Sequence, residues 1–470
     1  MSVAKRSRDD YLTPDEARAD ARRELLARAS GARPSAGGKA SKASKASSRT
    51  SSATASSKSS SSKSSSKSAA SSRRKSGRGA GATGKRASGS GAANGRAAKR
   101  AGMRNGAAGG VKRGGKGGRG NAGAGRTRGA AAVRTTPPGR RILAAMAFVC
   151  AAACVPAVAA RALPAGLQSL PYVPVLVAAT PWFMGLSVIA LMLAIASRRF
   201  LAGLLAVVTF AANVWWQYPF FSTTEPLTRA ADAAVGQAHA VTGDAYARVM
   251  TCNVYKGRAD ARAIVETVRD ERVEVLALQE TTDAFVAQLE EAGIGDYLPY
   301  AKVASSDGMY GNGLWSASPL IGPANDDVNS SASFMPGGTV AFADGVKIRF
   351  VSVHTTAPVP GYWGQWRRAL DELGAMKAHT DTRYVFMGDF NATYDHAPFR
   401  DFLGDRFRDG ARLAGRGWTF TWPADRGVLP PRFAGIDHVV VDQGVTAGRM
   451  KTVVVPGTDH AALLATLAVR

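Results

Sequence analysis

Three long apolar stretches follow one another in the middle of the chain and limit what it can fold into. They cover about residues 142–160, 172–197 and 201–221. A membrane-spanning helix needs about 20 predominantly apolar residues, so each stretch is long enough, the first only just. Their near-continuous apolarity leaves no polar face for water, which argues against core helices of a soluble protein. The sequence therefore predicts a three-helix membrane anchor over residues 141–221.

Basic residues around the apolar stretches predict how this anchor is oriented. Arg140 and Arg141 precede the first stretch, and Arg198 and Arg199 separate the second from the third. The loop after the first stretch carries only Arg161. Because basic residues favour the cytoplasmic side, we expect a cell-membrane protein with a cytoplasmic N-terminal tail and an extracytoplasmic C-terminal domain.

The first stretch has an alternative interpretation. Ala157-Val-Ala159 lies near its end, as in the cleavage site that follows the apolar region of a signal peptide. Its position so far from the first residue of this sequence argues against that interpretation.

Nearly all of the positive charge lies in the N-terminal tail. Residues 1–141 contain 34 Lys and Arg against 6 Asp and Glu, a net charge of +28, whereas the whole chain carries +26. The tail is rich in Ser, Gly and Ala, and such a segment cannot bury enough apolar surface to offset its ordering entropy. We expect residues 1–140 to be disordered. Two interpretations stay open: a solvated polycation, or a contact with anionic lipid or nucleic acid.

Residues 222–247 are expected to be a linker, and strands and helices alternate after it. The hydrophobic periodicity predicts strands at 248–253, 273–279, 346–354, 384–387, 436–442, 451–455 and 462–469, and helices at 259–271, 282–292 and 363–379. About 220 residues can bury a substantial core, so residues 248–470 are expected to form one α/β domain. The alternation does not distinguish a parallel sheet from a mixed one.

Short polar motifs recur in this C-terminal domain, most of them where a run of apolar residues ends. They are Thr251-Cys-Asn253, Leu278-Gln-Glu280, Ser352-Val-His354, Gly388-Asp-Phe-Asn391, Ile436-Asp-His438 and Thr458-Asp-His460. A buried strand that ends there delivers its last side chain to the edge of a sheet. Together the motifs supply carboxylates, carboxamides and imidazoles, which suit a magnesium-type ion and a water that attacks phosphorus.

The order of these motifs resembles the endonuclease/exonuclease/phosphatase superfamily, to which deoxyribonuclease I belongs. The resemblance covers about residues 248–470. It implies a four-layered α/β sandwich, in which two packed mixed sheets are flanked by helices. It also implies hydrolysis of a phosphate ester with a divalent metal. Each motif alone is a weak signal, whereas all of them in the order of the family form a strong one.

The resemblance implies a metal site made of Asn253, Glu280 and Asp459, with Glu280 as the main ligand. Oxygen ligands of this kind suit Mg²⁺ or Mn²⁺ rather than zinc. A carboxylate at the end of an apolar strand is costly unless it binds a cation or a hydrogen-bond donor. Glu280 is at such a position and would bind the metal. Taken alone, Glu280 is also compatible with a surface residue at a strand end.

The resemblance also implies the catalytic residues. Asp389 would position or deprotonate the attacking water, and Asn391 would donate to a phosphoryl oxygen. His460 would contact the phosphate, while Asp437 would hold the His460 ring in one tautomer. His354 would protonate the leaving oxygen, as in some family members. The remaining histidines are expected to be structural or exposed: His239, His379, His396 and His438.

The sequence constrains the identity of the substrate less than it constrains the type of reaction. Residues 222–470 contain 24 Lys and Arg against 29 Asp and Glu, which argues against tight non-specific binding of duplex nucleic acid. The leading hypothesis is a membrane-anchored, metal-dependent phosphoesterase that hydrolyses a phosphodiester of a nucleic acid, a phospholipid headgroup or a small molecule. Alternatives are a sphingomyelinase-like lipid phosphodiesterase and a non-catalytic membrane scaffold with a nucleic-acid- or lipid-binding tail.

Overall fold

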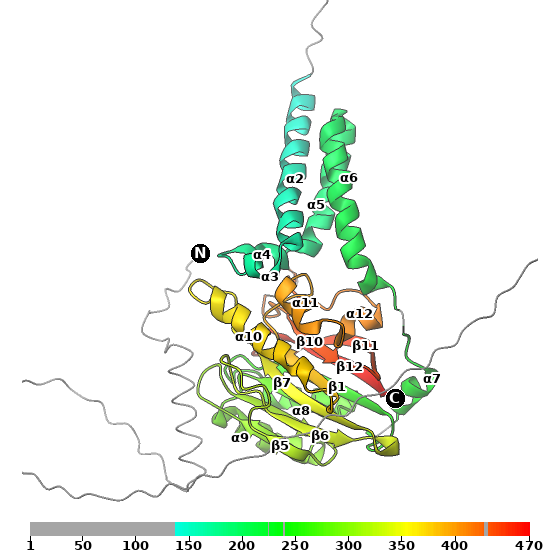
Figure 1. Ribbon diagram of the computed structural model, residues 1–470, viewed down its shortest axis with the longest axis vertical. Coiled ribbons are helices and arrows are strands. Elements are labelled where there is room, and N and C mark those ends of the chain that lie inside the picture. Colours follow the sequence, from blue (N-terminus) through cyan, green and yellow to red (C-terminus); the bar gives the residue numbers. More distant parts are fainter. Residues whose placement is uncertain (1–136, 224, 238–239, 427–430) are drawn as a thin grey trace, which may run out of the picture. The chain divides into compact units, whose positions relative to one another are not determined.

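A computed structural model describes residues 137–223, 225–237, 240–426 and 431–470. They form a bundle of helices and a two-sheet α/β domain (Figure 1). The expected disordered tail over residues 1–140 lies almost entirely outside the described residues.

Three long helices make up the bundle: α2 (Pro138–Ala162), α5 (Thr180–Ser197) and α6 (Phe200–Gln217). All three are long and apolar enough to cross a membrane, judged by length and composition, the last one together with the short helix η2 (Tyr218–Phe221) that follows it. Two short helices join α2 to α5, namely α3 (Ala165–Gln168) and α4 (Val173–Ala178). The expected stretch 172–197 is thus divided between α4 and α5. Pro181 lies in the first turn of α5, where its missing N–H leaves no hydrogen bond unmade.

Small and polar side chains lie inside this bundle, and large apolar ones lie outside. The buried positions between the helices are held by Ala147, Ala151, Ala190, Ala194, Ala202 and Ala206. The buried hydroxyls of Ser187 and Thr209 lie 3.1 Å apart and join α5 to α6. Phe200 and Trp215 are 82% and 80% exposed. This distribution is typical of helices that pack through small residues and face lipid, because so much exposed apolar surface is unfavourable in water.

Two six-stranded sheets form the C-terminal domain. The first has the order β11-β12-β1-β2-β4-β3, with β1 (Tyr246–Asn253), β2 (Val275–Gln279), β3 (Tyr300–Ala304), β4 (Asn312–Ser316), β11 (Val445–Val454) and β12 (Ala461–Val469). The second has the order β5-β6-β7-β8-β10-β9, with β5 (Ile321–Ala324), β6 (Gly337–Ala341), β7 (Lys347–His354), β8 (Tyr384–Asp389), β9 (Arg408–Asp409) and β10 (Asp437–Val441). Among the strands that the structure describes, the pairs β1–β2 and β7–β8 are parallel and the other pairs are antiparallel, so both sheets are mixed.

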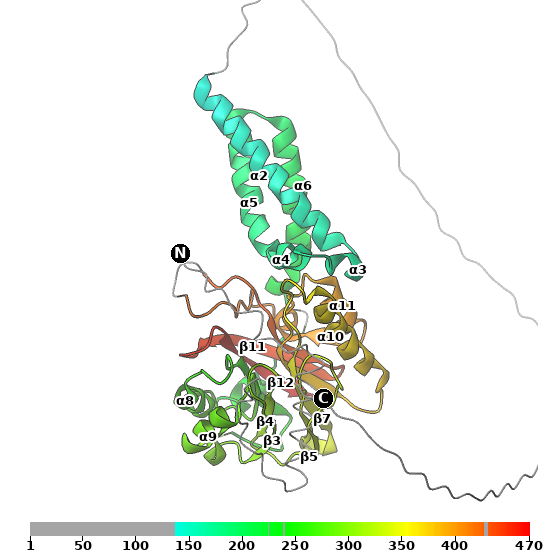
Figure 2. The same cartoon turned by 90° about the vertical axis from the view of Figure 1, so that its left-hand side faces the viewer.

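The two sheets pack face to face, and helices cover their outer faces. Val249, Phe350 and Val439 belong to the apolar layer between the sheets. Helices α8 (Ala261–Glu271) and α9 (Asp283–Glu291) pack on the first sheet, and α10 (Trp363–Ala375) and α11 (Ala397–Leu403) on the second. Figure 2 shows these two helix pairs on opposite sides of the strands. The expected α/β sandwich of two mixed sheets flanked by helices is confirmed. Two further short α-helices are α7 (Arg229–Ala234), which precedes β1, and α12 (Gly410–Ala414), which follows β9.

Candidate active site

Strand directions bring the sequence motifs to one edge of the sandwich. Because β1 and β2 are parallel, Asn253 and Glu280 leave the first sheet at the same end. Strand β12 is antiparallel to β1, so it begins at that end, directly after His460. In the second sheet, the backbone of Asp389 pairs with His354 on one side and with Asp437 on the other.

Asn253 joins the two sheets at this edge. Its Nδ2 donates to Oε1 of Glu280 over 3.2 Å and to Oδ2 of Asp389 over 3.1 Å. Its Oδ1 accepts from the backbone N–H of Tyr255 over 2.9 Å. The amide nitrogen of Asn253, rather than its oxygen, therefore faces the two carboxylates.

Gly388 allows Asp389 to sit against the neighbouring strand. Its φ is +153°, and a Cβ at this position would lie 1.9 Å from the backbone oxygen of Val353. The following carboxylate is 1% exposed, and its Oδ1 accepts from the backbone N–H of Asn391 over 2.8 Å. Burial raises the pKa of Asp389 to about 6, although the nearby His460 favours the charged form. Nδ2 of Asn391 donates to the backbone oxygen of Thr355 over 2.9 Å and lies 3.3 Å from Oδ2 of Asp389.

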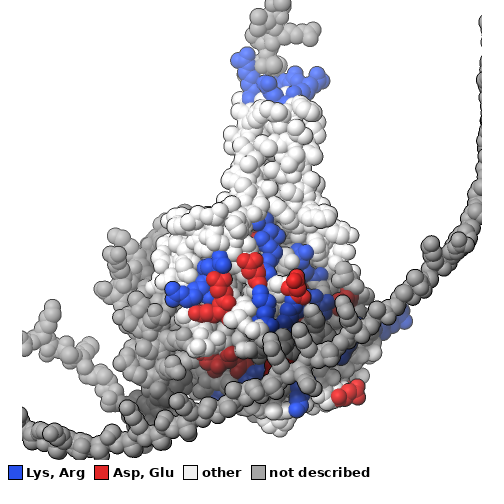
Figure 3. Space-filling model, in the orientation of Figure 1, with Lys and Arg blue, Asp and Glu red and all other residues white. Residues whose placement is uncertain are grey.

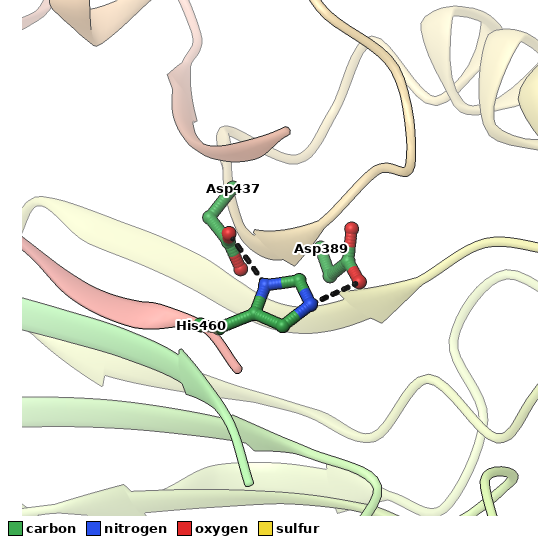
Figure 4. A group of neighbouring side chains, drawn as sticks. All are labelled: Asp389, Asp437 and His460. Atoms are coloured by element: carbon green, nitrogen blue, oxygen red, sulfur yellow. Dashed lines mark hydrogen bonds and ion pairs between the residues drawn. The ribbon is translucent and has the colours of Figure 1, made fainter. Parts of the chain in front are cut away.

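His460 lies between two carboxylates (Figure 4). Its Nδ1 is 2.9 Å from Oδ2 of Asp437, and its Nε2 is 3.7 Å from Oδ2 of Asp389. Burial disfavours the charged ring, but the charges of Asp437 and Asp389 outweigh it and raise the pKa of His460 to about 10. The ring is therefore held as an imidazolium with both N–H groups directed at carboxylates.

His354 faces the same space from the other side. Its Nδ1 lies 3.1 Å from the backbone oxygen of Met309, so this nitrogen is the N–H donor of the neutral ring. Its Nε2 lies 3.8 Å from Oδ2 of Asp389 and 3.9 Å from Oε1 of Glu280. Burial lowers the pKa of His354, which favours the neutral form with a free Nε2 lone pair.

Three buried carboxylate oxygens at the site lack hydrogen-bond partners among the described residues: Oε2 of Glu280, Oδ1 of Asp459 and Oδ1 of Asp437. The carboxylate of Asp437 already faces His460 through its other oxygen, whereas Glu280 and Asp459 are not held by a cationic ring in this way. The other oxygen of Asp459 accepts from Nε1 of Trp422 over 3.2 Å. Burial raises the pKa of Glu280, and the negative charge of Asp459 adds to this effect. Buried, unpaired carboxylate oxygens are costly, and oxygen ligands are those that Mg²⁺ and Mn²⁺ prefer. Glu280 and Asp459 thus fit a divalent cation.

A second group could also be considered as a metal site. Asp389, Asp437 and His460 each offer an atom within 4.8 Å of the others. However, both ring nitrogens of His460 already face carboxylates. The charges of these carboxylates raise the pKa of His460 and favour the doubly protonated ring, which has no lone pair for a metal. This group is therefore better suited to proton transfer than to metal binding.

The sequence did not indicate that His438 and Asp409 form a pair that holds the segment after Asp389 in place. Nδ1 of His438 lies 2.8 Å from Oδ1 of Asp409, and its Nε2 lies 2.9 Å from the backbone oxygen of Ala392. His438, one of the histidines expected to be structural or exposed, is buried. No local pattern indicates this pairing, because Asp409 lies in a strand of only two residues.

The same segment contacts the helical bundle a few residues further on. The buried carboxylate of Asp395 accepts from Nε of Arg161 over 2.7 Å and from Nε2 of Gln217 over 3.0 and 3.1 Å. Nε2 of His396 lies 2.8 Å from the backbone oxygen of Pro174. Residues 389–396 therefore reach from the candidate site to the ends of α2, α4 and α6. In the sequence, the apolar stretch before Arg161 is the one feature that could have indicated this network of hydrogen bonds.

The fold and the site define a mixed α/β sandwich with buried carboxylates and imidazoles at paired strand ends. Residues 250–460 match the sequence model of the Endonuclease/Exonuclease/phosphatase family. The match covers most of the two-sheet domain, from β1 to the start of β12. No curated protein matches the chain.

Several solved structures are similar to the domain. A D. rerio TDP2 complexed with a single strand DNA product is 18% identical, with a TM-score of 0.40, over 48% of this chain and 99% of that one. An endonuclease/exonuclease/phosphatase from Beutenbergia cavernae is 17% identical, with a TM-score of 0.36, over 48% and 72%. A family protein from Leptotrichia buccalis is 14% identical, with a TM-score of 0.39, over 48% and 99%.

Proposed function

We propose that the chain is a membrane-anchored, divalent-metal-dependent phosphodiesterase. The observation that supports this most directly is the pair of buried, unpaired oxygens of Glu280 and Asp459 beside the Asp389–His460–Asp437 group. A site with acceptors only would repel a phosphodiester, which is itself an anion. A bound cation together with the His460 imidazolium removes that repulsion.

The side chains divide the work of hydrolysis between them. The buried carboxylate of Asp389 accepts the proton of the attacking water. Asn253 and Asn391 donate to this carboxylate and thereby help to orient it toward the water. His460, held by Asp437, donates to a phosphoryl oxygen and stabilises the charge that develops there. His354 lies within 4 Å of both Glu280 and Asp389, so its neutral Nε2 would take up the proton that Asp389 accepts from the water and pass it to the leaving oxygen.

Glu280 and Asp459 would hold the metal, Mg²⁺ or Mn²⁺. When bound, the ion supplies Lewis-acid stabilisation of charge on the phosphate. Asn253 is the third predicted ligand. Its side-chain amide would have to rotate to bind a metal, because its oxygen accepts from the backbone N–H of Tyr255 and its nitrogen faces the carboxylates. Asn253 therefore acts in this arrangement as a bridge between Glu280 and Asp389.

A metal-removal experiment tests the proposed function. We expect the full-length protein in detergent to hydrolyse bis-p-nitrophenyl phosphate with Mg²⁺ or Mn²⁺. Chelation should lower the rate by about 10²-fold or more, because such an ion is worth several kcal/mol of charge stabilisation. Glu280→Gln should need a higher metal concentration for half-maximal rate, whereas Glu290→Gln on the exposed side of α9 should not. Metal-independent hydrolysis, or none of any diester, would contradict the proposal and favour a scaffold.

We further propose that α2, α5 and α6 span the cell membrane, with residues 222–247 linking them to an extracytoplasmic catalytic domain over 248–470. Figure 3 shows Lys and Arg at the end of the bundle far from the sheets, and Nε of Arg140 lies 3.4 Å from the backbone oxygen of Ser197 there. Because basic residues favour the cytoplasmic side, the sheets would face outward. Protease added to intact cells should then remove the catalytic domain, and its survival beside a digested extracellular control would overturn this orientation.

A further inference from the structure

An open pocket lies where the helical bundle meets the catalytic domain. Its volume is about 450 Å³, and it is lined by Trp182, Trp422, Pro423, Arg426, Pro431 and Phe433. Aromatic rings and prolines make up all of this lining except Arg426, so the pocket suits an apolar ligand with an anionic group near one end. Among the described residues that line the pocket, the exposed side chain of Arg426 is the one that carries a charge.

Direct contacts connect the pocket to the candidate active site. The indole of Trp422 lines the pocket, and its Nε1 donates to Oδ2 of Asp459 over 3.2 Å. The backbone N–H of Ala424 donates to the backbone oxygen of Asp459 over 2.7 Å. A ligand in the pocket therefore lies one side chain away from a carboxylate that is a proposed metal ligand.

The opposite wall of the pocket belongs to the bundle. Trp182 lies in the first turn of α5, and its Nε1 donates to the backbone oxygen of Phe433 over 2.9 Å. Its ring is stacked on the Phe433 ring with an interplanar angle of 2°. Tryptophan near the end of a membrane-spanning helix is typical of the membrane–water interface. If α5 spans the membrane, the pocket opens at the level of the lipid headgroups.

We propose that this pocket receives the hydrocarbon chain of a membrane phosphodiester lipid whose phosphate lies at the active site. The inference rests on the proposed function and names the substrate class of the same site. Water would add across a P–O bond of the lipid, and the products would be an alcohol and a phosphate monoester. The chain would remain between Trp182 and Trp422 while the phosphate reacts beside Asp459 and Glu280.

Three diesters with one leaving group test this substrate class. Methyl, hexadecyl and thymidine-5′ p-nitrophenyl phosphate differ only in the group opposite p-nitrophenol. We expect the full-length protein in mixed micelles to have a higher kcat/KM for the hexadecyl diester than for the methyl diester. In Trp182→Ala and Phe433→Ala, the hexadecyl-to-methyl ratio should fall about tenfold, the loss expected when about two methylene groups lose apolar contacts.

Trp215→Ala is the matched control, because Trp215 is 80% exposed and lies outside the pocket lining. Its hexadecyl-to-methyl ratio should equal that of the wild type. A wild-type protein that hydrolyses the methyl diester but does not prefer the hexadecyl diester would overturn the lipid inference and leave the proposed function intact. Preference for the thymidine diester that is lost in Trp182→Ala would also overturn it, in favour of a nucleic-acid base in the pocket.

A binding measurement separates the inference from catalysis. A hexadecyl phosphodiester with a diazirine at the end of its chain should, after irradiation, label Trp422, Pro423 or Phe433. Labelling should decrease in Trp182→Ala and persist in Trp215→Ala. Absence of label at these residues would overturn the inference, whether or not any diester is hydrolysed. Label without hydrolysis would support the pocket and contradict the proposed function.

Discussion

Asp389→Asn is expected to lower kcat/KM for bis-p-nitrophenyl phosphate by about 10³-fold, within the range measured for loss of a proton-transfer group. The asparagine keeps the volume of Asp389, and its oxygen can still accept from the backbone N–H of Asn391. It cannot accept the proton of the attacking water. The loss should therefore appear in kcat with little change in the folded structure, as judged by near-ultraviolet circular dichroism.

Asp401→Asn is the matched control for this substitution. Asp401 lies on the exposed side of α11 in the same domain. Its variant should hydrolyse the diester at the wild-type rate. If Asp389→Asn retained activity within about threefold of that control, a far smaller loss than removal of a catalytic base causes, the role of Asp389 would be wrong.

Asp395→Ala is expected to lower the free energy of unfolding by about 3–5 kcal/mol, the usual cost of removing one partner of a buried ion pair. The side chains of Arg161 and Asp395 are only 9% and 3% exposed. Without the carboxylate, the Arg161 guanidinium stays buried next to the Trp216 ring, 4.9 Å from its centroid, with no anion to balance it. Nε2 of Gln217 loses its acceptor as well. Thermal unfolding of the full-length protein in detergent measures the loss.

An exposed ion pair of the same domain provides the control. Arg269 and Asp270 are 2.8 Å apart but 53% and 64% exposed, so Asp270→Ala should cost no more than about 1 kcal/mol. Arg161→Met combined with Asp395→Leu should recover much of the stability, because it removes both buried charges together. Equal unfolding midpoints for Asp395→Ala and Asp270→Ala would show that this buried pair does not stabilise the protein.

Local patterns in the sequence predicted most of the elements that frame the site. The buried strand β8 is a continuous apolar run that ends in a polar motif, and α8 has an apolar face at helical spacing. Sequence analysis did not identify five strands, namely β3, β4, β5, β6 and β9. β5 is mostly exposed and β9 has two residues, so neither has an apolar period long enough to detect.

The candidate site was predicted as a set of residues, not as an arrangement. The order of the motifs singled out Glu280, Asp389, Asp437 and His460, and the structure brings their side chains to one edge of the sandwich. The sequence did not indicate that Asn253 would turn its nitrogen toward the carboxylates. That orientation depends on the backbone N–H of Tyr255, which occupies the amide oxygen.

The sequence by itself determined that three apolar stretches precede an α/β domain, and which polar residues end the strands of that domain. Both are local properties, because burial imposes a period or a continuous apolar run on neighbouring residues. Only the tertiary structure decided that Arg161 pairs with Asp395, and that Trp182 and Trp422 line one pocket beside Asp459. Strand order and helix packing bring these residues together across 37 to 251 positions of chain, and no local pattern encodes such contacts.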